Sequence, residues 1–437
     1  MKILIYGLNF APELSGAGKY TAEMAEMLAG CGHDVRVVCA PPYYPDWKVA
    51  NGYSMWRYRR DIIRGVRIWR APLWVPPKPS GLKRMLHLAS FALSSLPLLA
   101  RQIAWRPGAV MLIAPTMACA PGALALARVT GAKAWLHVQD YEVDAAFDLG
   151  LLKSTRAARI AYGIERLVLK RFDVVSSITN QMVERAVGKG VDAAKTEFLP
   201  NWVDTRDIFP LGRVSEYRET LGIPAANTVV LYSGNMGAKQ GLETLADAAR
   251  ALAARDDISF VFCGNGAARD DLFKRCEGLP NCRFLPLQPV SSLNELLNVA
   301  DIHVLPQRGD AADLVMPSKL TGMLASGRAV IAMARPGTAL YEAVANNGMI
   351  VPPEDTGELA DAIAALAEDG ARRAAIGAAG AGRRYAETML SPLSTLLTLD
   401  TRLALLTGDA VPGPKPAAAP MANGPILPAH VEKSEVE

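Results

Sequence analysis

The sequence predicts an α/β protein built from two Rossmann-like domains in tandem. Short apolar segments alternate with amphipathic segments through the first half of the chain, and the same alternation starts again in the second half. Apolar strands separated by helices are typical of a parallel sheet whose two faces are covered. The length of 437 residues also exceeds what one hydrophobic core usually serves, so two domains are expected.

Six short apolar segments in the first half are predicted to be strands. They are Ile3–Tyr6, Val35–Ala40, Val66–Ala71, Ala109–Ala114, Ala134–Val138 and Val174–Ile178. Four segments between them have the apolar spacing that is typical of helices: Tyr20–Ala29, Lys83–Ile103, Met117–Val129 and Ala157–Lys170. Glycines in "AGCGHD" and "VTGAK" follow two of these segments, where helices favour glycine as a C-cap.

The second half repeats this scheme. Its predicted strands are Thr228–Tyr232, Ile258–Phe262, Arg283–Leu287, Ile302–Leu305, Val330–Met333 and Met349–Val351. Its predicted helices are Leu242–Ala254, Arg269–Cys276, Leu293–Val299, Ser318–Ala325, Gly337–Val344 and Glu358–Ala367. Between the halves, "LPNWVDTRDIFPLGRVSEY" is rich in turn formers and lacks periodicity, so we expect the domain boundary near Val203–Pro210.

We therefore expect an N-terminal domain over residues 1–203 and a C-terminal domain over residues 204–388. The segment Tyr385–Leu406 has a helical pattern, and we expect residues 389–408 to pack back on the first domain. Residues 409–437 are rich in proline and alanine, so they are predicted to be a disordered tail. Two doubly wound domains in tandem are expected to face each other across a central cleft at the carboxyl ends of their strands.

The composition excludes several classes of protein. The net charge of +4 is too small for a typical nucleic-acid binder, so we expect no nucleic-acid partner. The six cysteines are scattered and contain no C-x-x-C pair, which indicates neither a disulfide framework nor a zinc site. No secretory signal is apparent after Met1. These features favour a cytoplasmic protein.

Three glycine-rich junctions follow predicted strands and precede predicted helices. "NFAPELSGAGKY" contains Gly16 and Gly18, "YSGNMGAKQGLETL" begins after the strand that ends at Tyr232, and "FCGNGAARDDL" contains Gly264–Gly266. Glycine lets the backbone approach a ligand, and a helix N-terminus favours an anion. The first loop alone is as consistent with a plain turn as with a phosphate site. Three such junctions favour phosphate or sugar ligands in the predicted cleft.

Five motifs, in order along residues 1–385, resemble glycosyltransferases of the GT-B fold in the large retaining class called family 4. The motifs are the proline–glycine turn "PELSGAG" of the first loop, "GHDVRVVCA", "LPNWVDTRDIFP" with Trp202 where glycine is usual, "SGNMGAKQGLETLADA" and "PSKLTGMLASGRAVIA". The resemblance implies that the C-terminal domain binds a nucleotide-diphosphate sugar. It also implies that the N-terminal domain supplies the acceptor site, and that the anomeric configuration is retained.

The chain departs from the family pattern in its donor-binding segments. The two glutamates that usually precede the A-x-G segment are replaced by Leu314 and Gly322. In the Gly234 loop, the arginine and lysine positions hold Asn235 and Gln240. This pattern resembles a subgroup that makes bacterial surface polysaccharides, including colanic-acid-type fucosyl and N-acetylfucosaminyl transferases. We expect a donor such as GDP-fucose or a UDP-sugar.

The resemblance and the glycine loops together give the expected site. His137 and Asp140, in "WLHVQDYEVDAAFDLG", are the expected catalytic residues, because the family places a histidine that contacts the donor sugar at this position. The neighbouring Glu142, Asp144 and Asp148 are each interpreted as solvated carboxylates at a strand end. The expected donor-binding residues are Gly16, Gly18, Gly234, Asn235, Lys239, Gln240, Gly264, Asn265, Gly266, Asp313, Ser318 and Lys319. No D-x-D motif is evident, so no essential metal and no further cofactor are expected.

The segment Lys83–Arg106 joins a long apolar run to basic ends. It is consistent with an ordinary core helix and with a helix at a membrane surface. The resemblance favours membrane contact at the inner face of the cytoplasmic membrane, because acceptors in such pathways are lipid-linked saccharides. Two other functions stay open: a nucleotide-sugar epimerase of similar fold, and an inactive scaffold of a polysaccharide assembly complex, which the missing glutamates favour.

Overall fold

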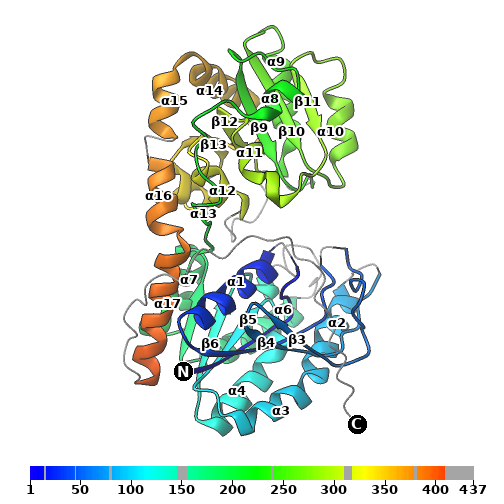
Figure 1. Cartoon of the computed structure of the whole chain (residues 1–437), viewed down its shortest axis with the longest axis vertical. Helices are drawn as coiled ribbons and strands as arrows, with labels where there is room; N and C mark the ends of the chain where they lie inside the picture. Colours follow the sequence, from blue (N-terminus) through cyan, green and yellow to red (C-terminus); the bar gives the residue numbers. More distant parts are fainter. Residues whose placement is uncertain are drawn as a thin grey trace. The chain divides into compact units, whose positions relative to one another are not determined.

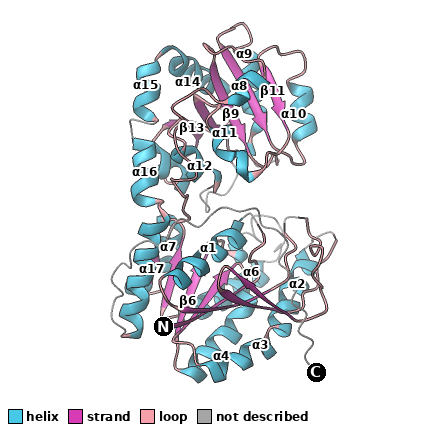
Figure 2. Ribbon diagram, viewed as in Figure 1, coloured by secondary structure: helices cyan, strands magenta, loops and turns pink. Residues whose placement is uncertain are grey.

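The computed structural model describes residues 1–13, 16–44, 46–77, 81–144, 155–237, 240–309, 317–377 and 381–408 (Figure 1). The chain forms two compact units. Unit 1 comprises Met1–Val175, Gly190–Lys195 and the chain from Thr398, and unit 2 comprises Ser176–Lys189 and Thr196–Leu397. The predicted tail, residues 409–437, lies outside the described residues. The described chain contains two β-sheets, each accompanied by helices (Figure 2).

The first sheet has eight strands in the order β3-β4-β2-β1-β5-β6-β7-β8. They are β1 (Lys2–Gly7), β2 (Asp34–Cys39), β3 (Arg59–Ile63), β4 (Val66–Arg70), β5 (Ala109–Ala114), β6 (Lys133–Val138), β7 (Val174–Ser177) and β8 (Thr196–Phe198). The six predicted strands are confirmed to within about a residue at each end. Strand β1 pairs in parallel with both β2 and β5. Strands that follow β1 along the chain are therefore added first on one side of β1 and then on the other. Ligands of doubly wound sheets bind at such a switch in strand order.

The expectation of a wholly parallel first sheet is wrong at one edge. Strand β3 pairs antiparallel with β4. Arg64 and Gly65, both with positive φ, make the two-residue turn between them. The sequence pattern missed β3 because three of the five residues in "RRDII" are charged. Its Asp61 faces inward and accepts a hydrogen bond from the buried Arg70 at 2.5 Å, which explains a carboxylate in a strand.

The helices of unit 1 also correct one prediction. They are α1 (Gly16–Gly30), α2 (Gly81–Ser94), α3 (Leu96–Trp105), η1 (Met117–Cys119), α4 (Ala120–Thr130) and α6 (Thr155–Leu169). The predicted single helix Lys83–Ile103 is two helices that meet at Ser95. Pro97 stands in the first turn of α3, where its missing N–H costs nothing but would break a continuous helix.

Two further helices lead from unit 2 to unit 1: α16 (Ala381–Met389) and α17 (Pro392–Thr407). Pro392 begins the second, so the helical segment predicted at Tyr385–Leu406 is interrupted. Within unit 1, the buried Asp400 of α17 accepts a hydrogen bond from His33 Nε2 at 2.8 Å. His33 Nδ1 lies 3.1 Å from the Met1 amine. This histidine therefore has the structural role that its position in a helix-to-strand turn suggested.

The second sheet has six strands in the order β11-β10-β9-β12-β13-β14, and every pair is parallel. The strands are β9 (Thr228–Ser233), β10 (Ile258–Cys263), β11 (Cys282–Leu285), β12 (Ile302–Leu305), β13 (Ala329–Met333) and β14 (Met349–Val351). All six were predicted, with small differences at their ends. The described helices of unit 2 are α7 (Asn180–Gly188), α8 (Glu216–Thr220), α9 (Leu242–Ala251), α10 (Arg269–Arg275), α11 (Leu293–Leu297), α12 (Lys319–Ala325), α13 (Ala339–Ala345), α14 (Thr356–Glu368) and α15 (Gly370–Ile376).

Alternate strand residues of the second sheet face two different helical layers. Val230, Phe260 and Val304 belong to a core with residues of α9, α10 and α14. Val229 and Val261 pack instead with residues of α11. This two-residue period is what a sheet buried on both faces requires. The parallel pairing of β9 with β10 places the carboxyl ends of these strands side by side.

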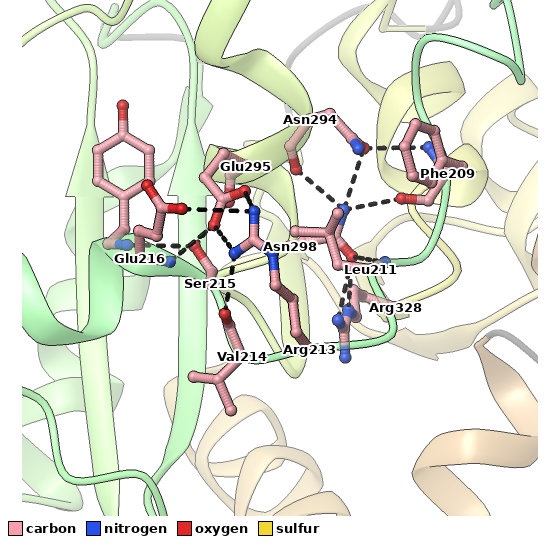
Figure 3. A network of polar contacts seen from close by, with 11 residues as sticks. Phe209, Leu211, Arg213, Val214, Ser215, Glu216, Asn294, Glu295, Asn298 and Arg328 are labelled. Carbon is pink, nitrogen blue, oxygen red and sulfur yellow. Dashed lines mark hydrogen bonds and ion pairs between the residues drawn. The ribbon is translucent and has the colours of Figure 1, made fainter.

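The segment after Val203 is fastened to unit 2 by a polar network around α11 (Figure 3). The Asn298 side chain accepts from the Leu211 N–H at 3.0 Å and donates to the Phe209 carbonyl at 2.9 Å. Arg213 makes two hydrogen bonds to the Glu295 carboxylate, at 3.0 and 2.9 Å. The segment after Val203 lacks hydrophobic periodicity, but its conformation is fixed because side chains of α11 hydrogen-bond to its backbone N–H and C=O groups.

Candidate functional site

The two glycine loops of unit 2 form one structure. Strands β9 and β10 run in parallel with Ser233 opposite Cys263, so both loops start at the same edge of the sheet. The Gly234 N–H donates to the Cys263 carbonyl at 2.9 Å, and the Met236 N–H donates to the Asn265 carbonyl at 2.8 Å. The structure therefore brings together the predicted residues of the Gly234 loop and the Gly264 loop.

Glycine is required in these loops by the packing of one backbone on the other. A Cβ at Gly264 would lie 1.9 Å from the Gly234 carbonyl oxygen, and one at Gly266 would lie 2.3 Å from the Met236 carbonyl oxygen. Both residues also have φ values, +145° and +152°, that side chains rarely adopt. The glycine pattern "GNG" is thus explained without a ligand, although it places loop backbone at the ligand end of the sheet.

Lys319 lies against the Gly234 loop. Its Nζ donates to the Tyr232 hydroxyl at 2.8 Å and lies 4.2 Å from the centre of the Tyr232 ring. The Tyr232 hydroxyl in turn donates to the Asn235 carbonyl at 2.5 Å. A Cβ added to Gly234 would lie 3.4 Å from Nζ. Burial lowers the pKa of Lys319 to about 8, because the charged ammonium has lost much of its water.

The other positions of unit 2 that the sequence singled out have different surroundings. Gln240 stabilises the conformation of the Gly234 loop, because its side-chain Oε1 accepts a hydrogen bond from the Gly237 N–H at 3.0 Å. Ser318 is exposed at the start of α12 and makes no side-chain cap. Gly322 is partly buried, and an added Cβ would lie 3.3 Å from a Leu297 methyl carbon. Three residues lie outside the described part of the chain: Lys239, Asp313 and Leu314.

The first loop differs from those of unit 2. Gly16 begins α1 with a φ of +59°, and an added Cβ would meet nothing within 4 Å. Gly18 is packed, because an added Cβ would lie 2.8 Å from the Glu13 Oε2. Only the backbone conformation of Gly16 therefore requires glycine, and the space beside it is open.

Sequence reasoning missed Glu13, the residue that holds this first loop. Its Oε1 accepts from the Tyr43 and Tyr44 N–H groups at 2.9 and 3.0 Å, and its Oε2 accepts from Asn9 Nδ2 at 2.9 Å. Burial raises the pKa of Glu13, although these hydrogen bonds act in the other direction. The carboxylate connects the loop after β1 to the loop after β2, a long-range contact that no local pattern signals.

His137 is buried in β6, and only 1% of its surface is exposed. Its Nε2 lies 2.9 Å from Gln139 Nε2; since an amide nitrogen can only donate, this imidazole nitrogen accepts and carries no proton. Burial lowers the pKa of His137 to about 4, so the ring is neutral at physiological pH. The imidazole therefore supplies no positive charge at this position. Asp140 follows β6 on the same stretch of chain.

The interpretation of Glu142 and Asp144 as solvated carboxylates is wrong. Asp144 is 3% exposed. Glu142 Oε2 accepts from the Met117 N–H at 2.8 Å, and burial raises the pKa of Glu142 to about 7. Asp148 lies outside the described residues. His303 is buried with its Nε2 3.1 Å from Ser326 Oγ, which agrees with the structural role expected for a strand histidine.

The sequence predicts no essential metal and favours contact with a membrane surface. No group of three or more His, Cys, Asp or Glu side chains in the described ranges could hold a metal ion. Within the same ranges, every helix is too short or too polar to cross a membrane.

The chain matches two protein families over most of its length. Residues 15–202 match the glycosyl transferase 4-like domain, and residues 227–369 match the glycosyl transferases of group 1. The putative colanic acid biosynthesis glycosyl transferase WcaI of Escherichia coli is 46% identical over 340 residues, which cover 76% of this chain and 83% of WcaI. The probable glycosyltransferase WbjE of Pseudomonas aeruginosa is 25% identical over 54% of this chain and 60% of its own.

Solved structures share the fold. The sucrose-phosphate synthase of Thermosynechococcus elongatus superimposes with a TM-score of 0.71 at 18% identity, covering 93% of this chain and 99% of that protein. HepE of Anabaena, solved in complex with UDP and glucose, has a TM-score of 0.64 at 16% identity and covers 93% of this chain and 100% of its own. The motifs, the two Rossmann-like units and these relatives agree. This chain belongs to the GT-B glycosyltransferases of the family 4 type.

Proposed function

We propose that this glycosyltransferase moves a sugar from a nucleotide-diphosphate donor to a lipid-linked saccharide during bacterial exopolysaccharide biosynthesis, with retention of configuration. The similarity to WcaI supports a role in surface polysaccharide assembly of the colanic acid type. A solved structure of the fold neighbour HepE contains UDP-glucose, which supports a nucleotide-sugar donor. GDP-fucose or a UDP-sugar is the donor class that the sequence pattern favours.

The observation that carries the proposal is the position of Lys319 against the Gly234 loop. Its ammonium is held by the Tyr232 hydroxyl at 2.8 Å. The pKa of about 8 leaves most of it charged near neutral pH. An anion nearby favours the charged form further, so a diphosphate would regain the interaction that burial removed. We assign the donor diphosphate to Lys319 and the loops of Gly234 and Gly264, with Lys239, Asp313 and Ser318 as further candidates. Leaving-group stabilisation of this kind is electrostatic and needs no metal.

In unit 1, the open space beside Gly16 supports a ligand contact at the first loop. His137 and Asp140 remain the proposed reaction-centre residues of this unit. Because His137 is neutral, its proposed role is a hydrogen bond to a sugar hydroxyl rather than charge stabilisation. The acceptor saccharide is proposed to bind at this end of the first sheet.

Membrane contact at the inner face of the cytoplasmic membrane is supported by one exposed surface of unit 1. Trp56 and Leu93 are 71% and 68% exposed, and the Tyr58 hydroxyl joins their two segments by donating to the Ser94 carbonyl at 2.8 Å. The opposite face of α2 is buried at Phe91. The two interpretations of this helix therefore apply to different faces. Lys83 of α2 and Arg101 of α3 are exposed cations of the same unit, as a helix at a membrane surface would need.

The test is a donor panel. The purified protein is incubated with UDP-, GDP- and dTDP-sugars and with the glycolipid fraction extracted from cells that lack this protein, in which its acceptor accumulates. We expect one donor to transfer its sugar to the fraction, with release of the nucleoside diphosphate. An epimerase would convert the donor sugar without the fraction, and an inactive scaffold would bind no donor. Either result, or the absence of any transfer, would overturn the proposal.

A further inference from the structure

Glu142 is a carboxylate at the ligand end of the first sheet that the proposed reaction has not used. It follows β6, and its partner Met117 follows the neighbouring parallel strand β5, whose Ala114 stands opposite Val138. The carboxyl ends of adjacent parallel strands meet at one edge of a sheet, where ligands bind in doubly wound folds. Glu142 is therefore placed where unit 1 is expected to receive a saccharide.

The two oxygens of this carboxylate have different surroundings. Oε2 accepts the Met117 N–H at 2.8 Å, which fixes the side chain relative to η1. Oε1 is buried and has no hydrogen-bond partner among the residues that the structure describes. A buried polar atom without a partner is costly, and such atoms often mark the position of a ligand or water. The side chain is thus oriented through one oxygen, while the other is buried without a partner among the described residues.

The groups around Glu142 come from four elements, and they oppose one another. Arg84 of α2 favours the ionised form, whereas Asp140 on the same stretch of chain and the buried Glu165 of α6 disfavour it. Cys119 of η1 is also a neighbour, and its thiol pKa is raised by burial. The net effect, dominated by burial, raises the pKa of Glu142 to about 7. A small change of pH near neutrality consequently changes its charge.

We propose that Glu142 is an acceptor-binding residue whose free oxygen Oε1 receives a hydroxyl group of the acceptor saccharide. This inference rests on the proposed function, because it needs a hydroxyl-bearing acceptor in unit 1. A hydroxyl donates a stronger hydrogen bond to a carboxylate than to a neutral carboxyl group. Acceptor use should therefore increase as the pH rises through about 7, while donor binding at unit 2 stays independent of Glu142.

The test compares the wild type with Glu142→Gln in the transfer assay with the glycolipid fraction. Glutamine keeps the size of the side chain and an oxygen for the Met117 N–H, but it does not titrate. We expect KM for the fraction to rise about tenfold or more at pH 8, the loss of one hydrogen bond to a charged group. The donor KM should be unchanged. With the donor saturating, the ratio of wild-type to variant kcat/KM for the fraction should rise between pH 6 and 8, because a change in the charge of Lys319 affects both proteins alike and cancels in the ratio.

Controls and a direct readout separate the possible outcomes. Glu216→Gln, an exposed carboxylate of unit 2, should behave as the wild type. In protein labelled with ¹³C at the glutamate carboxyl carbon, the resonance that Glu142→Gln removes should titrate near pH 7. An unchanged KM for the fraction, or an ordinary acidic titration of that resonance, overturns the inference while leaving the proposed function intact. A lowered melting temperature with unchanged kinetics shows a purely structural carboxylate. Absence of transfer by the wild type overturns both proposals.

Discussion

The glycine loops of unit 2 and the glycine loop of unit 1 resemble each other in sequence and differ in structure. In unit 2, Gly264 and Gly266 are pressed against the backbone of the Gly234 loop, so a methyl group has no room. In unit 1, Gly16 has open space around it and is constrained only by its positive φ. Similar glycine-rich junctions therefore serve two purposes: one joins loops to each other, and the other leaves room beside a helix start. Substitutions can separate these purposes.

The largest effect is expected at Gly264. Gly264→Ala would place a Cβ against the Gly234 carbonyl in a conformation that only glycine readily adopts. We expect a loss of about 2–4 kcal/mol in the free energy of unfolding, measured by urea denaturation. Gly278→Ala is the matched control, because Gly278 also has a positive φ but nothing within 4 Å of an added Cβ. Equal losses for the two variants would mean that φ alone requires glycine at position 264.

Lys319 should give the next largest effect, this time on donor binding. Lys319→Met keeps most of the side-chain volume and removes the ammonium. The expected loss of donor affinity is about 1.5–3 kcal/mol, typical of a hydrogen bond to a charged group, as measured by calorimetry. Lys274→Met, at an exposed position of α10, should bind the donor as the wild type does. A wild-type affinity in Lys319→Met would make Lys319 a structural partner of Tyr232.

Gly16 provides the contrast within unit 1. Asparagine tolerates positive φ better than other side chains do, so Gly16→Asn should keep its melting temperature while filling the open space. We expect transfer activity to fall about tenfold, roughly 1.4 kcal/mol. Gly222→Asn is the control, because Gly222 has a φ of +62° and equally open surroundings in unit 2. Retained activity in Gly16→Asn would reduce the first loop to a turn.

The smallest effect concerns the exposed basic surface of unit 1. Lys83→Gln should weaken binding to vesicles containing anionic lipid by about 1 kcal/mol, the contribution of a single cation near the surface. Sedimentation with vesicles at low and high salt measures this change, and Lys274→Gln in unit 2 is the matched control. Equal losses in both variants would indicate a nonspecific effect of net charge.

The sequence predicted the strands well because their signal is local. Ala109–Ala114 and Ile302–Leu305 were predicted with the bounds that the structure has, since continuous apolar segments between turn formers have few other structures available. Strand β3 was missed because its charges are paired across the sheet, as Asp61 is with Arg70. The break at Ser95 was missed because apolar periodicity continues through it, and Pro97 was the available signal.

The candidate site was predictable only in part, for a physical reason. The glycine loops and Lys319 are marked by spacing along the chain, and the structure brings the described ones of unit 2 together. Burial and long-range hydrogen bonds determine the roles of three other residues, Tyr232, Glu13 and Glu142. In the sequence, Tyr232 is simply the end of an apolar strand, and Glu142 is one of several strand-end carboxylates. Burial of a single polar group depends on tertiary packing, so a single sequence does not signal it.

The central claim is that the donor diphosphate binds to Lys319 of unit 2. The most direct measurement is the titration of the Lys319 side chain by NMR, in protein labelled with ¹³C at lysine Cε, with the resonance assigned by its absence in Lys319→Met. The free protein should show the lowered pKa of about 8 that burial produces. A bound nucleoside diphosphate should raise this pKa, because the anion stabilises the ammonium. An unchanged pKa at saturating nucleotide would contradict the claim.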